Sequence, residues 1–404
     1  MSSRRFSIGL RVALTIFTVT LFVTSAWAQA PWERVLYSFK GTDGANPYAS
    51  LVMDTRSGNL YGTTYSGGAY GAGVAFELYH KVGGGWGERV LYNFGAAGTD
   101  GANPYASLIW GAPGNLYGTT ASGGAYGNGT VFQLRQHTGG SWTEQVLHSF
   151  NGANGSGPFG GLIFDAAGSL YGTTNLGGAY GYGTVFQLSP QADGGWTENA
   201  VYGFCPLRPC RDGDQPHGGL VFDTNGNLYG TTDAGGAYIS YGTVFELSPN
   251  GDGSWTEQVL HSFNGAEDVF PDLVNLIFDA RGNLYGTTEG TVFELSPQAA
   301  GGWTEKVLWL GASDPNSGVI FDAAGNLYGT TYYGGYYSVG MVFELSPQAD
   351  GGWTERTLHS FDPKCHNDGA YPVASVIIDA HGNLYGTTRY GGAYGNGTVF
   401  EITP

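Results

Sequence analysis

The sequence predicts an all-β protein, a seven-bladed β-propeller with four antiparallel strands in each blade. The first observation is a repeat, because "LYGTT" begins at residues 60, 116, 170, 228, 284, 327 and 384. The second is a tryptophan that opens a strand-like stretch once per repeat, at residues 32, 86, 142, 196, 255, 303 and 353. The third is composition, since 71 glycines beside 27 tyrosines and 22 phenylalanines are typical of short strands and tight turns. Repeats of about fifty residues without a helical period favour a propeller over a sandwich or an open solenoid.

The first element is a secretory signal peptide, predicted for residues 1–28. Arginines near the start precede the apolar run 12–23, which is too short to span a bilayer comfortably. The small residues of "TSAWAQA" predict cleavage after Ala28. We therefore expect residues 29–404 to form one propeller domain that is secreted, either extracellular or periplasmic in a two-membrane bacterium, with no membrane span after cleavage.

Each repeat then contains four strand-like pieces of five to nine residues. In the third repeat they are "GLIFD" (161–165), "SLYGTT" (169–174), "GTVFQL" (183–188) and the stretch that begins at Trp196. Gly, Asn, Asp or Pro bounds each piece, as at the ends of strands. We therefore expect one blade per repeat, with the "LIFD" piece innermost.

The two ends of the chain predict how the ring closes. The mature chain begins with a fourth-type strand, residues 32–39, and ends with a third-type strand, residues 398–403. The last blade therefore lacks its outer strand unless the N-terminus supplies it. This pairing would remove the free strand edges that an open ring exposes.

The "GNLYGTT" motif has a structural interpretation. The Asp and Asn that flank its Gly turn are expected to bond the local backbone, which is favoured over a calcium loop because "DTNGN" (223–227) lacks a distal bidentate acid. Leu and Tyr should point to opposite faces of the strand, and each face should pack on a neighbouring blade. We expect the Gly after Tyr to leave room for bulky side chains of the next blade.

Charge and cysteine content limit the partners. The formal net charge of −17 disfavours nucleic acid and anionic membranes. Cys205 and Cys210 in "CPLRPC" are close enough to form a local disulfide in an oxidising compartment, which leaves Cys365 over. The three cysteines have no fourth ligand nearby, so we expect no metal site. We also expect no cofactor, and a monomer.

The repeats carry a family resemblance. "GNLYGTT", "GGAYGNGTVFEI" (391–402) and the Trp-led strand in series resemble the GloVer (Gloeo/Verruco-type) tandem repeat family, over essentially the whole mature chain. The turn before "LYG" is also similar, more loosely, to that of NHL-type propellers. The resemblance implies an exported or cell-surface protein with a propeller-like fold. It implies no catalytic residue, because the family has no established activity.

One face of the propeller is expected to carry the long loops. The fourth-to-first and second-to-third connections should emerge together, because alternate connections of an antiparallel sheet do so. The second-to-third loops read "GGAY" or similar, except in the fifth repeat, where "EG" (289–290) remains. They present six tyrosines that can bind a sugar or a peptide: Tyr70, Tyr126, Tyr180, Tyr238, Tyr337 and Tyr394. Alternatively, these rings only cover glycine-rich backbone.

An acidic side chain also recurs in the fourth-to-first connections. It lies four residues before a proline, at Asp43, Asp100, Asp212, Glu267 and Asp368, with Asn154 in the third repeat. A ring of carboxylates at a channel mouth would attract a cation or a basic ligand. The plainer interpretation is that each side chain caps its own loop.

An enzyme would have to break the sevenfold symmetry. The segment 205–219, with Arg208, Asp214 and His217, is the strongest break, and 362–369 is the second. Neither contains a nucleophile elbow, a metal-binding His pair or a phosphate loop. We therefore expect a non-catalytic propeller that binds a carbohydrate or a protein on its long-loop face. The alternatives are a polysaccharide lyase or glycosidase, which paired carboxylates in the channel would favour, and a purely structural surface component.

Overall fold

The computed structural model describes residues 32–404 except 113, 266–269, 272–274, 312, 316, 363 and 365–366. The predicted signal peptide, Glu267 and Cys365 therefore lie outside the described residues. Within the described part the regular elements are all strands. No helix there is long and apolar enough to cross a membrane.

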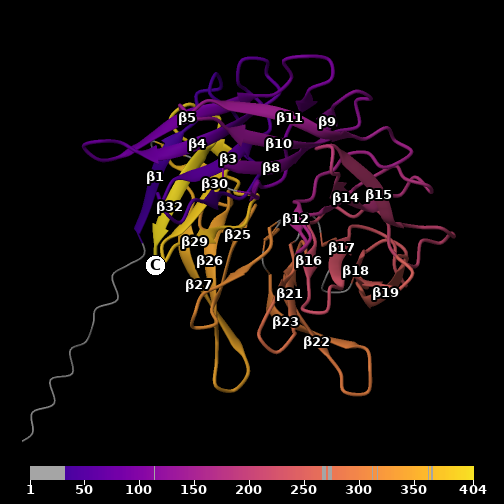
Figure 1. Cartoon of the computed structure of the whole chain (residues 1–404). Coiled ribbons are helices and arrows are strands. Elements are labelled where there is room, and N and C mark those ends of the chain that lie inside the picture. The colour runs from indigo at the N-terminus through magenta and orange to yellow at the C-terminus, as the bar shows by residue number, and fades with distance from the viewer. Residues whose placement is uncertain are drawn as a thin grey trace, which may run out of the picture. The chain divides into compact units, whose positions relative to one another are not determined.

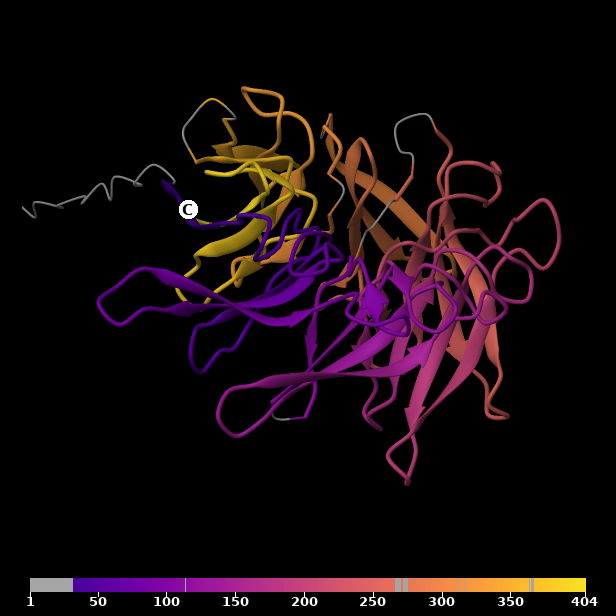
Figure 2. The same ribbon diagram turned by 90° about the horizontal axis from the view of Figure 1, so that it is seen from above.

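Seven four-stranded antiparallel sheets form the blades of a propeller ring, as predicted. They follow one another in chain order, and the yellow last blade lies beside the indigo first blade (Figure 2). Blade 1 has β2 (Val52–Met53), β3 (Leu60–Thr64), β4 (Val74–His80) and β5 (Trp86–Asn93), and blade 2 has β7 (Ile109–Trp110), β8 (Asn115–Thr120), β10 (Thr130–Gln136) and β11 (Trp142–Ser149). Blade 3 has β12 (Ile163–Phe164), β13 (Leu170–Thr174), β14 (Thr184–Pro190) and β15 (Trp196–Gly203).

The remaining blades repeat the same order. Blade 4 has β16 (Val221–Phe222), β17 (Leu228–Thr232), β18 (Thr243–Pro249) and β19 (Trp255–Ser262), and blade 5 has β20 (Ile277–Phe278), β21 (Leu284–Thr287), β22 (Thr291–Pro297) and β23 (Trp303–Leu310). Blade 6 has β24 (Ile320–Phe321), β25 (Leu327–Thr331), β26 (Met341–Pro347) and β27 (Trp353–Ser360). Blade 7 has β29 (Ile377–Ile378), β30 (Leu384–Thr388), β32 (Thr398–Thr403) and, from the N-terminus, β1 (Trp32–Ser38). Two short ribbons, β6 (Gly101–Ala102) with β9 (Ser122–Gly123) and β28 (Gly369–Ala370) with β31 (Tyr390–Gly391), join loops.

The N-terminal strand closes the ring, as predicted. β1 pairs antiparallel with β32, from Trp32 opposite Thr403 to Ser38 opposite Thr398. Figure 1 shows the indigo β1 beside the yellow β32. The last blade therefore has four strands. Its outer strand comes from the N-terminal end of the described chain, and the other three come from the C-terminal end.

The innermost strands are shorter than predicted. In each blade only two residues pair, for example Ile163 and Phe164 with Tyr171 and Leu170, where five were expected. Where the residues before them are described, they face the central channel, and backbone carbonyls there accept hydrogen bonds from the neighbouring blade instead. Thr119 Oγ1, for example, donates to Gly160 O of the next blade at 3.4 Å. Pairing within the blade is therefore confined to the end of the segment.

The core lies between the blades. Leu60 and Tyr61 of β3 belong to different apolar clusters, one shared with blade 7 and the other with blade 2. Phenylalanines cross six of the seven interfaces edge to face, such as Phe94 against Phe132 at 5.0 Å between ring centroids, and Trp309 meets Phe343 at the seventh. The first Thr of every "LYGTT" is buried and donates its hydroxyl hydrogen to a backbone carbonyl of the next blade. The acceptors for Thr63, Thr119, Thr173, Thr231, Thr287, Thr330 and Thr387 are Ala106, Gly160, Gly218, Pro271, Ser317, Ala374 and Ala49.

The glycine of "LYGTT" serves its own blade, and the expectation of space for the next blade was wrong. Gly118 lies opposite Phe132 in the β8–β10 register. A Cβ on Gly118 would lie 2.7 Å from Phe132 Cζ and 3.0 Å from Leu108 Cδ2, both of the same blade. The cross-strand phenylalanine therefore folds over the glycine, which is why the position excludes a side chain.

Candidate functional site

The two sets of long loops share one face and bond to each other. The connection that enters a blade forms a bridge with that blade's second-to-third loop, as in Ala45 with Ser66 and Ser156 with Leu176. In blades 2 and 7 the same contact extends to the ribbons β6–β9 and β28–β31. This pairing holds the ends of the entering connections next to the channel.

A proline then fixes where each connection reaches the channel. Pro104, which enters blade 2, packs on Gly73 of blade 1, so that a Cβ on Gly73 would lie 2.9 Å from Pro104 Cδ. Gly73 also has a φ of +95°, a conformation that favours glycine. The same Gly–Pro contact joins Gly129 to Pro158, Gly183 to Pro216, Gly242 to Pro271, Gly340 to Pro372 and Gly397 to Pro47. Where it is described, the residue after each of these prolines is thereby presented to the channel.

These residues line a cavity at the centre of the ring, to which all seven blades contribute. The post-proline residues that line it are Tyr48, Tyr105, Phe159, His217 and Val373. Their chemistry breaks the sevenfold symmetry, because four neighbouring blades supply aromatic rings. No Asp or Glu is among the described residues that line the cavity. The carboxylate pair that would favour a glycosidase is thus not found in this part of the chain.

The rings form a continuous row, which we call the aromatic arc. Tyr48 stacks on Tyr105 with ring centroids 4.6 Å apart and planes at 28°. Tyr105 meets Phe159 edge to face at 5.2 Å, and Phe159 meets His217 at 4.8 Å. Tyr65 contacts both stacked tyrosines edge to face. The arc comprises Tyr48, Tyr65, Tyr105, Phe159, Tyr332, Tyr371 and Tyr390. Of these, Tyr48, Tyr105 and Phe159 line the central cavity, and the others adjoin them through ring contacts and Arg389.

Arg389 connects the two halves of the arc. Its guanidinium carbon lies 4.8 Å from the ring centroid of Tyr48 and 4.7 Å from that of Tyr390. Its Nη1 donates to the Tyr332 hydroxyl at 3.3 Å, and the Tyr332 ring meets Tyr371 at 4.9 Å. The Arg389 Nε is buried and has no hydrogen-bond partner. A cation held between aromatic faces with an unused donor is suited to bind a ligand oxygen.

The arc combines flat apolar faces with polar edges. Burial raises the pKa of Tyr48 to about 12, although Arg389 acts to lower it. Its hydroxyl therefore keeps its proton at neutral pH and can donate a hydrogen bond. Stacking faces together with fixed hydroxyl and guanidinium donors are the features with which proteins bind the apolar faces and hydroxyls of sugars.

The six tyrosines predicted from the "GGAY" loops are exposed, from 43% for Tyr337 to 65% for Tyr126. None of them is among the described residues that line the central cavity. Tyr180 instead lies over the outer strand of its own blade, where a Cβ on Gly203 would be 3.4 Å from its Cδ2. These tyrosines form an outer rim on the long-loop face, separate from the aromatic arc.

The predicted acidic side chains cap their own loops. Asp43 accepts hydrogen bonds from Lys40 N at 2.7 Å and from the Tyr37 hydroxyl at 2.5 Å. Asp100 does the same with Ala96 N and the Tyr92 hydroxyl. Asp212 and Asp368 each accept from a loop amide in the same way, and Glu267 is not described. Asp43, Asp100, Asp212 and Asp368 lie beside the outer strands and do not line the channel cavity.

Each capped loop also faces a glutamate of the next outer strand, and we call this contact an outer junction. It contains the loop acid, a Tyr or His of the preceding outer strand, and the Glu of "WTE" or its counterpart. Burial, and then the charge of the adjacent Asp, raises the pKa of Glu88, Glu144 and Glu257 to about 7. One oxygen of each of these carboxylates is buried without a hydrogen-bond partner.

The predicted break in symmetry at 205–219 is a rigid loop. Cys205 and Cys210 are joined by a disulfide. The Arg208 guanidinium lies 4.8 Å from the Tyr182 ring centroid, and Asp214 forms a bridge to Ala234. Of the residues singled out in this loop, only His217 lines the central cavity.

The aromatic arc was missed at the sequence level. Three of its members, Tyr48, Tyr105 and Phe159, occupy a position that varies between repeats, directly after the repeated turn proline of "NPYAS" and "GPFGG", and Tyr65 and Tyr332 directly follow "LYGTT". The sequence did contain a clue to this site. The residue after the proline differs between repeats, as Tyr, Phe or His, although the segments around it are alike. Arg389 follows "LYGTT" in the last repeat, and only ring closure brings it to Tyr48.

The comparisons with known proteins agree with this fold. The model of the Gloeobacter/Verrucomicrobia repeat matches residues 15–207 and 241–404. A streptogramin B lyase structure is similar at 13% identity over 92% of this chain and 97% of that one, with a TM-score of 0.56. A catalytically inactive histidine-to-alanine virginiamycin B lyase from Staphylococcus aureus, with quinupristin, is similar at 14% identity over 93% and 99%, with a TM-score of 0.56.

A third similar structure is the extracellular domain of a predicted hybrid two-component system from B. thetaiotaomicron. Its identity is 11% over 91% of this chain and 39% of that one, with a TM-score of 0.57. At these identities the likeness shows the fold alone. No curated protein matches the chain.

Proposed function

The chain belongs to the Gloeobacter/Verrucomicrobia repeat family, and from this premise and the geometry of the channel we propose that it is an exported, non-catalytic propeller that binds a carbohydrate. The observation that carries the proposal is the aromatic arc with Arg389 at its centre. In a purely structural ring the seven blades could carry the same residues at the channel. A binding site for one ligand requires residues that differ between blades, as they do here.

Two features support export. The first 28 residues have the pattern of a signal peptide. The Cys205–Cys210 disulfide is of a kind that persists in oxidising compartments. Secretion would place the arc where extracellular or periplasmic glycans are available.

A glycan array with residues 29–404 tests the proposal, followed by titration of any glycan that binds. Removing a stacking face with Tyr48→Ala, or the donor with Arg389→Ala, should weaken binding by about tenfold or more, which corresponds to about 1.4 kcal/mol. Tyr126→Ala is the matched control, because this tyrosine is 65% exposed on the outer rim. Its affinity should equal that of the unmodified chain.

Variants of the outer rim test the alternative that the ligand binds there and not on the aromatic arc. A triple variant of Tyr70, Tyr126 and Tyr180 to Ala leaves the arc intact. If this variant loses the glycan while Tyr48→Ala keeps it, the ligand binds on the rim and the arc is a packing feature. If no glycan binds, but a protein ligand binds the unmodified chain and not Tyr48→Ala, the aromatic arc is the binding site of a protein and the carbohydrate assignment is wrong.

His217 supports a second candidate, an enzyme that acts on polysaccharide. Its ring lies in the central cavity beside Phe159, where it could serve as a general base to a ligand held on the arc. Depolymerisation assays with the unmodified chain and with His217→Ala separate the candidates. Loss of a measurable activity in His217→Ala but not in His137→Ala, an exposed control, would replace the non-catalytic proposal.

A further inference from the structure

We propose that Glu33, His359 and Asp368 form a zinc site that ties the N-terminal strand to the blade before it. His359 is in β27, the outer strand of blade 6, and Asp368 is in the connection that leaves this strand. Glu33 is in β1, the outer strand of blade 7. The three side chains therefore meet at the outer junction where the ring is closed by the N-terminus.

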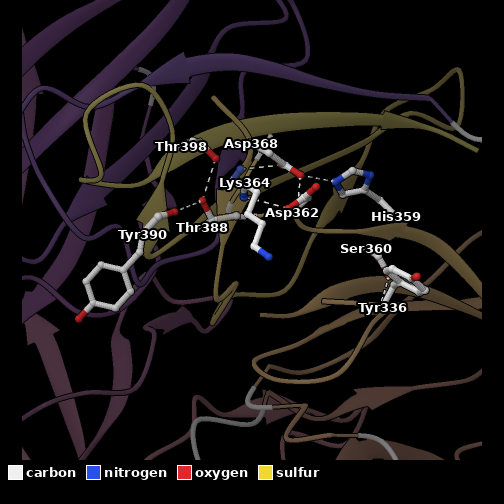
Figure 3. A network of polar contacts seen from close by, with 10 residues as sticks. Tyr336, His359, Ser360, Asp362, Lys364, Asp368, Thr388, Tyr390 and Thr398 are labelled. Atoms are coloured by element: carbon white, nitrogen blue, oxygen red, sulfur yellow. Dashed lines mark hydrogen bonds and ion pairs between the residues drawn. The ribbon is translucent and has the colours of Figure 1, made fainter. Parts of the chain in front are cut away.

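The donor atoms have nearly the separation that zinc requires. One ligand atom from each residue lies within 4.8 Å of the others. His359 Nε2 and Asp368 Oδ2 are 3.2 Å apart, and Figure 3 shows the two side chains pointing toward each other. Tetrahedral zinc with bonds of about 2.0 Å places its donors about 3.3 Å apart. Zinc would take the place of the hydrogen between His359 Nε2 and Asp368 Oδ2, and the Glu33 carboxylate would have to move closer.

The surroundings prepare the carboxylates for a cation. The Asp368 side chain is only 9% exposed, and its Oδ2 is oriented by a hydrogen bond from Asp362 N at 2.8 Å. Glu33 Oε1 is buried and has no hydrogen-bond partner. A buried carboxylate oxygen without a donor is costly, and a bound cation would satisfy it. A hydrogen bond from a second residue to a ligating carboxylate is the usual support of a metal site.

The other outer junctions show what distinguishes this one. Where the preceding outer strand carries a tyrosine, as at Tyr37 and Tyr92, its hydroxyl donates to the loop Asp and no nitrogen ligand is present. His148 faces Asn154, which offers an amide in place of a carboxylate. Among the junctions whose three positions are all described, only that of Glu33 combines an imidazole with two carboxylates.

This set of donors indicates the ion. One imidazole and two carboxylates suit zinc, whereas calcium and magnesium prefer oxygen ligands alone. A water molecule would complete four-coordination. The ion would link β1 to blade 6, and so would stabilise the closed ring through an interaction that unfolding breaks.

Calorimetric titration of the chelator-treated chain, residues 29–404, with ZnCl₂ tests the site. We expect a saturable zinc site that depends on His359, with a rise in melting temperature on saturation and little effect of CaCl₂. His359→Tyr should abolish this binding yet fold, since tyrosine occupies the same position in other blades. Glu33→Gln should weaken it, and Co²⁺ loaded in place of zinc should give the visible absorption of a tetrahedral site that disappears in His359→Tyr.

Two controls make the outcome decisive. Glu88→Gln removes the equivalent glutamate from a junction that has tyrosine, and it should bind zinc like the unmodified chain. Cys365→Ser tests whether the thiol three residues before Asp368 in the sequence is the ligand instead. The proposal is overturned if the chain binds no zinc, if His359→Tyr binds zinc unchanged, or if Cys365→Ser alone abolishes binding.

Discussion

At the residue scale, the repeat is constrained by space as much as by hydrogen bonding. "LYGTT" places Leu toward one neighbouring blade and Tyr toward the other, and its first Thr bonds the next blade. These roles follow from strand alternation, so the sequence predicts Leu and Tyr well. The cross-strand partner of the Gly could not be predicted, because the register between strands decides which phenylalanine covers it.

Gly118→Ala should therefore destabilise the propeller by about 1–3 kcal/mol, the usual cost of overpacking a core. The new methyl group would lie 2.7 Å from Phe132 Cζ, and neither strand can shift without disturbing its register. Gly98→Ala is the control, because a Cβ there meets nothing within 4 Å. Urea unfolding of both variants measures the difference, and equal midpoints would refute the packing role.

At the element scale, β1 is the strand with the largest consequence. It covers the edge of β32 and contributes Leu36 to the cluster between blades 7 and 1. The chain ends predicted this pairing directly, since a third-type strand at one end requires a fourth-type strand from the other. The two-residue inner strands were not predictable in the same way, because local residue preferences do not show that the backbone bonds a neighbouring blade.

Deleting residues 29–39 should lower the melting temperature and the solubility, since it exposes the edge of β32. A milder variant, Leu36→Ala, keeps the strand but removes a side chain that is 8% exposed, at a cost of about 2–5 kcal/mol. Arg34→Ala, on the same strand but 42% exposed, should change stability little. Thermal unfolding compares the three, and a deletion that melts like the full chain would contradict the closing role of β1.

At the scale of the whole molecule, closure creates what the repeats alone do not show. The number of blades could be predicted by counting the repeats, and the long-loop face could be predicted because the loop lengths are set within each repeat. The aromatic arc could not, because Arg389 and Tyr48 come from the last and first blades and meet only across the closed ring. The junction of Glu33 with His359 and Asp368 arises in the same way.

Outer junctions recur around the closed ring, and several contain a buried glutamate with a raised pKa, so the stability of the ring should depend on pH. The pKa of Glu88, Glu144 and Glu257 is raised to about 7, first by burial and then by Asp43, Asp100 and Asp212 respectively, from an ordinary value of 4.5. A raised pKa in the folded state contributes stability that is complete below the ordinary value and is lost as the pH rises through 7. At Asp223 and Asp379 burial raises the pKa, but hydrogen bonds outweigh it and lower the pKa below 3.8. Their contribution is lost in acid.

The melting temperature, measured with a chelator present, should therefore be highest near about pH 4.5, fall between about pH 5 and 7, and level off above this interval. The triple variant Glu88→Gln, Glu144→Gln and Glu257→Gln keeps the side-chain size but cannot ionise, so its melting temperature should fall less over this interval. Asp350→Asn, in an exposed turn, should follow the unmodified chain. A melting temperature that rises from about pH 5 to 7, or an unchanged slope in the triple variant, would show that these carboxyls are not buried together in the closed ring.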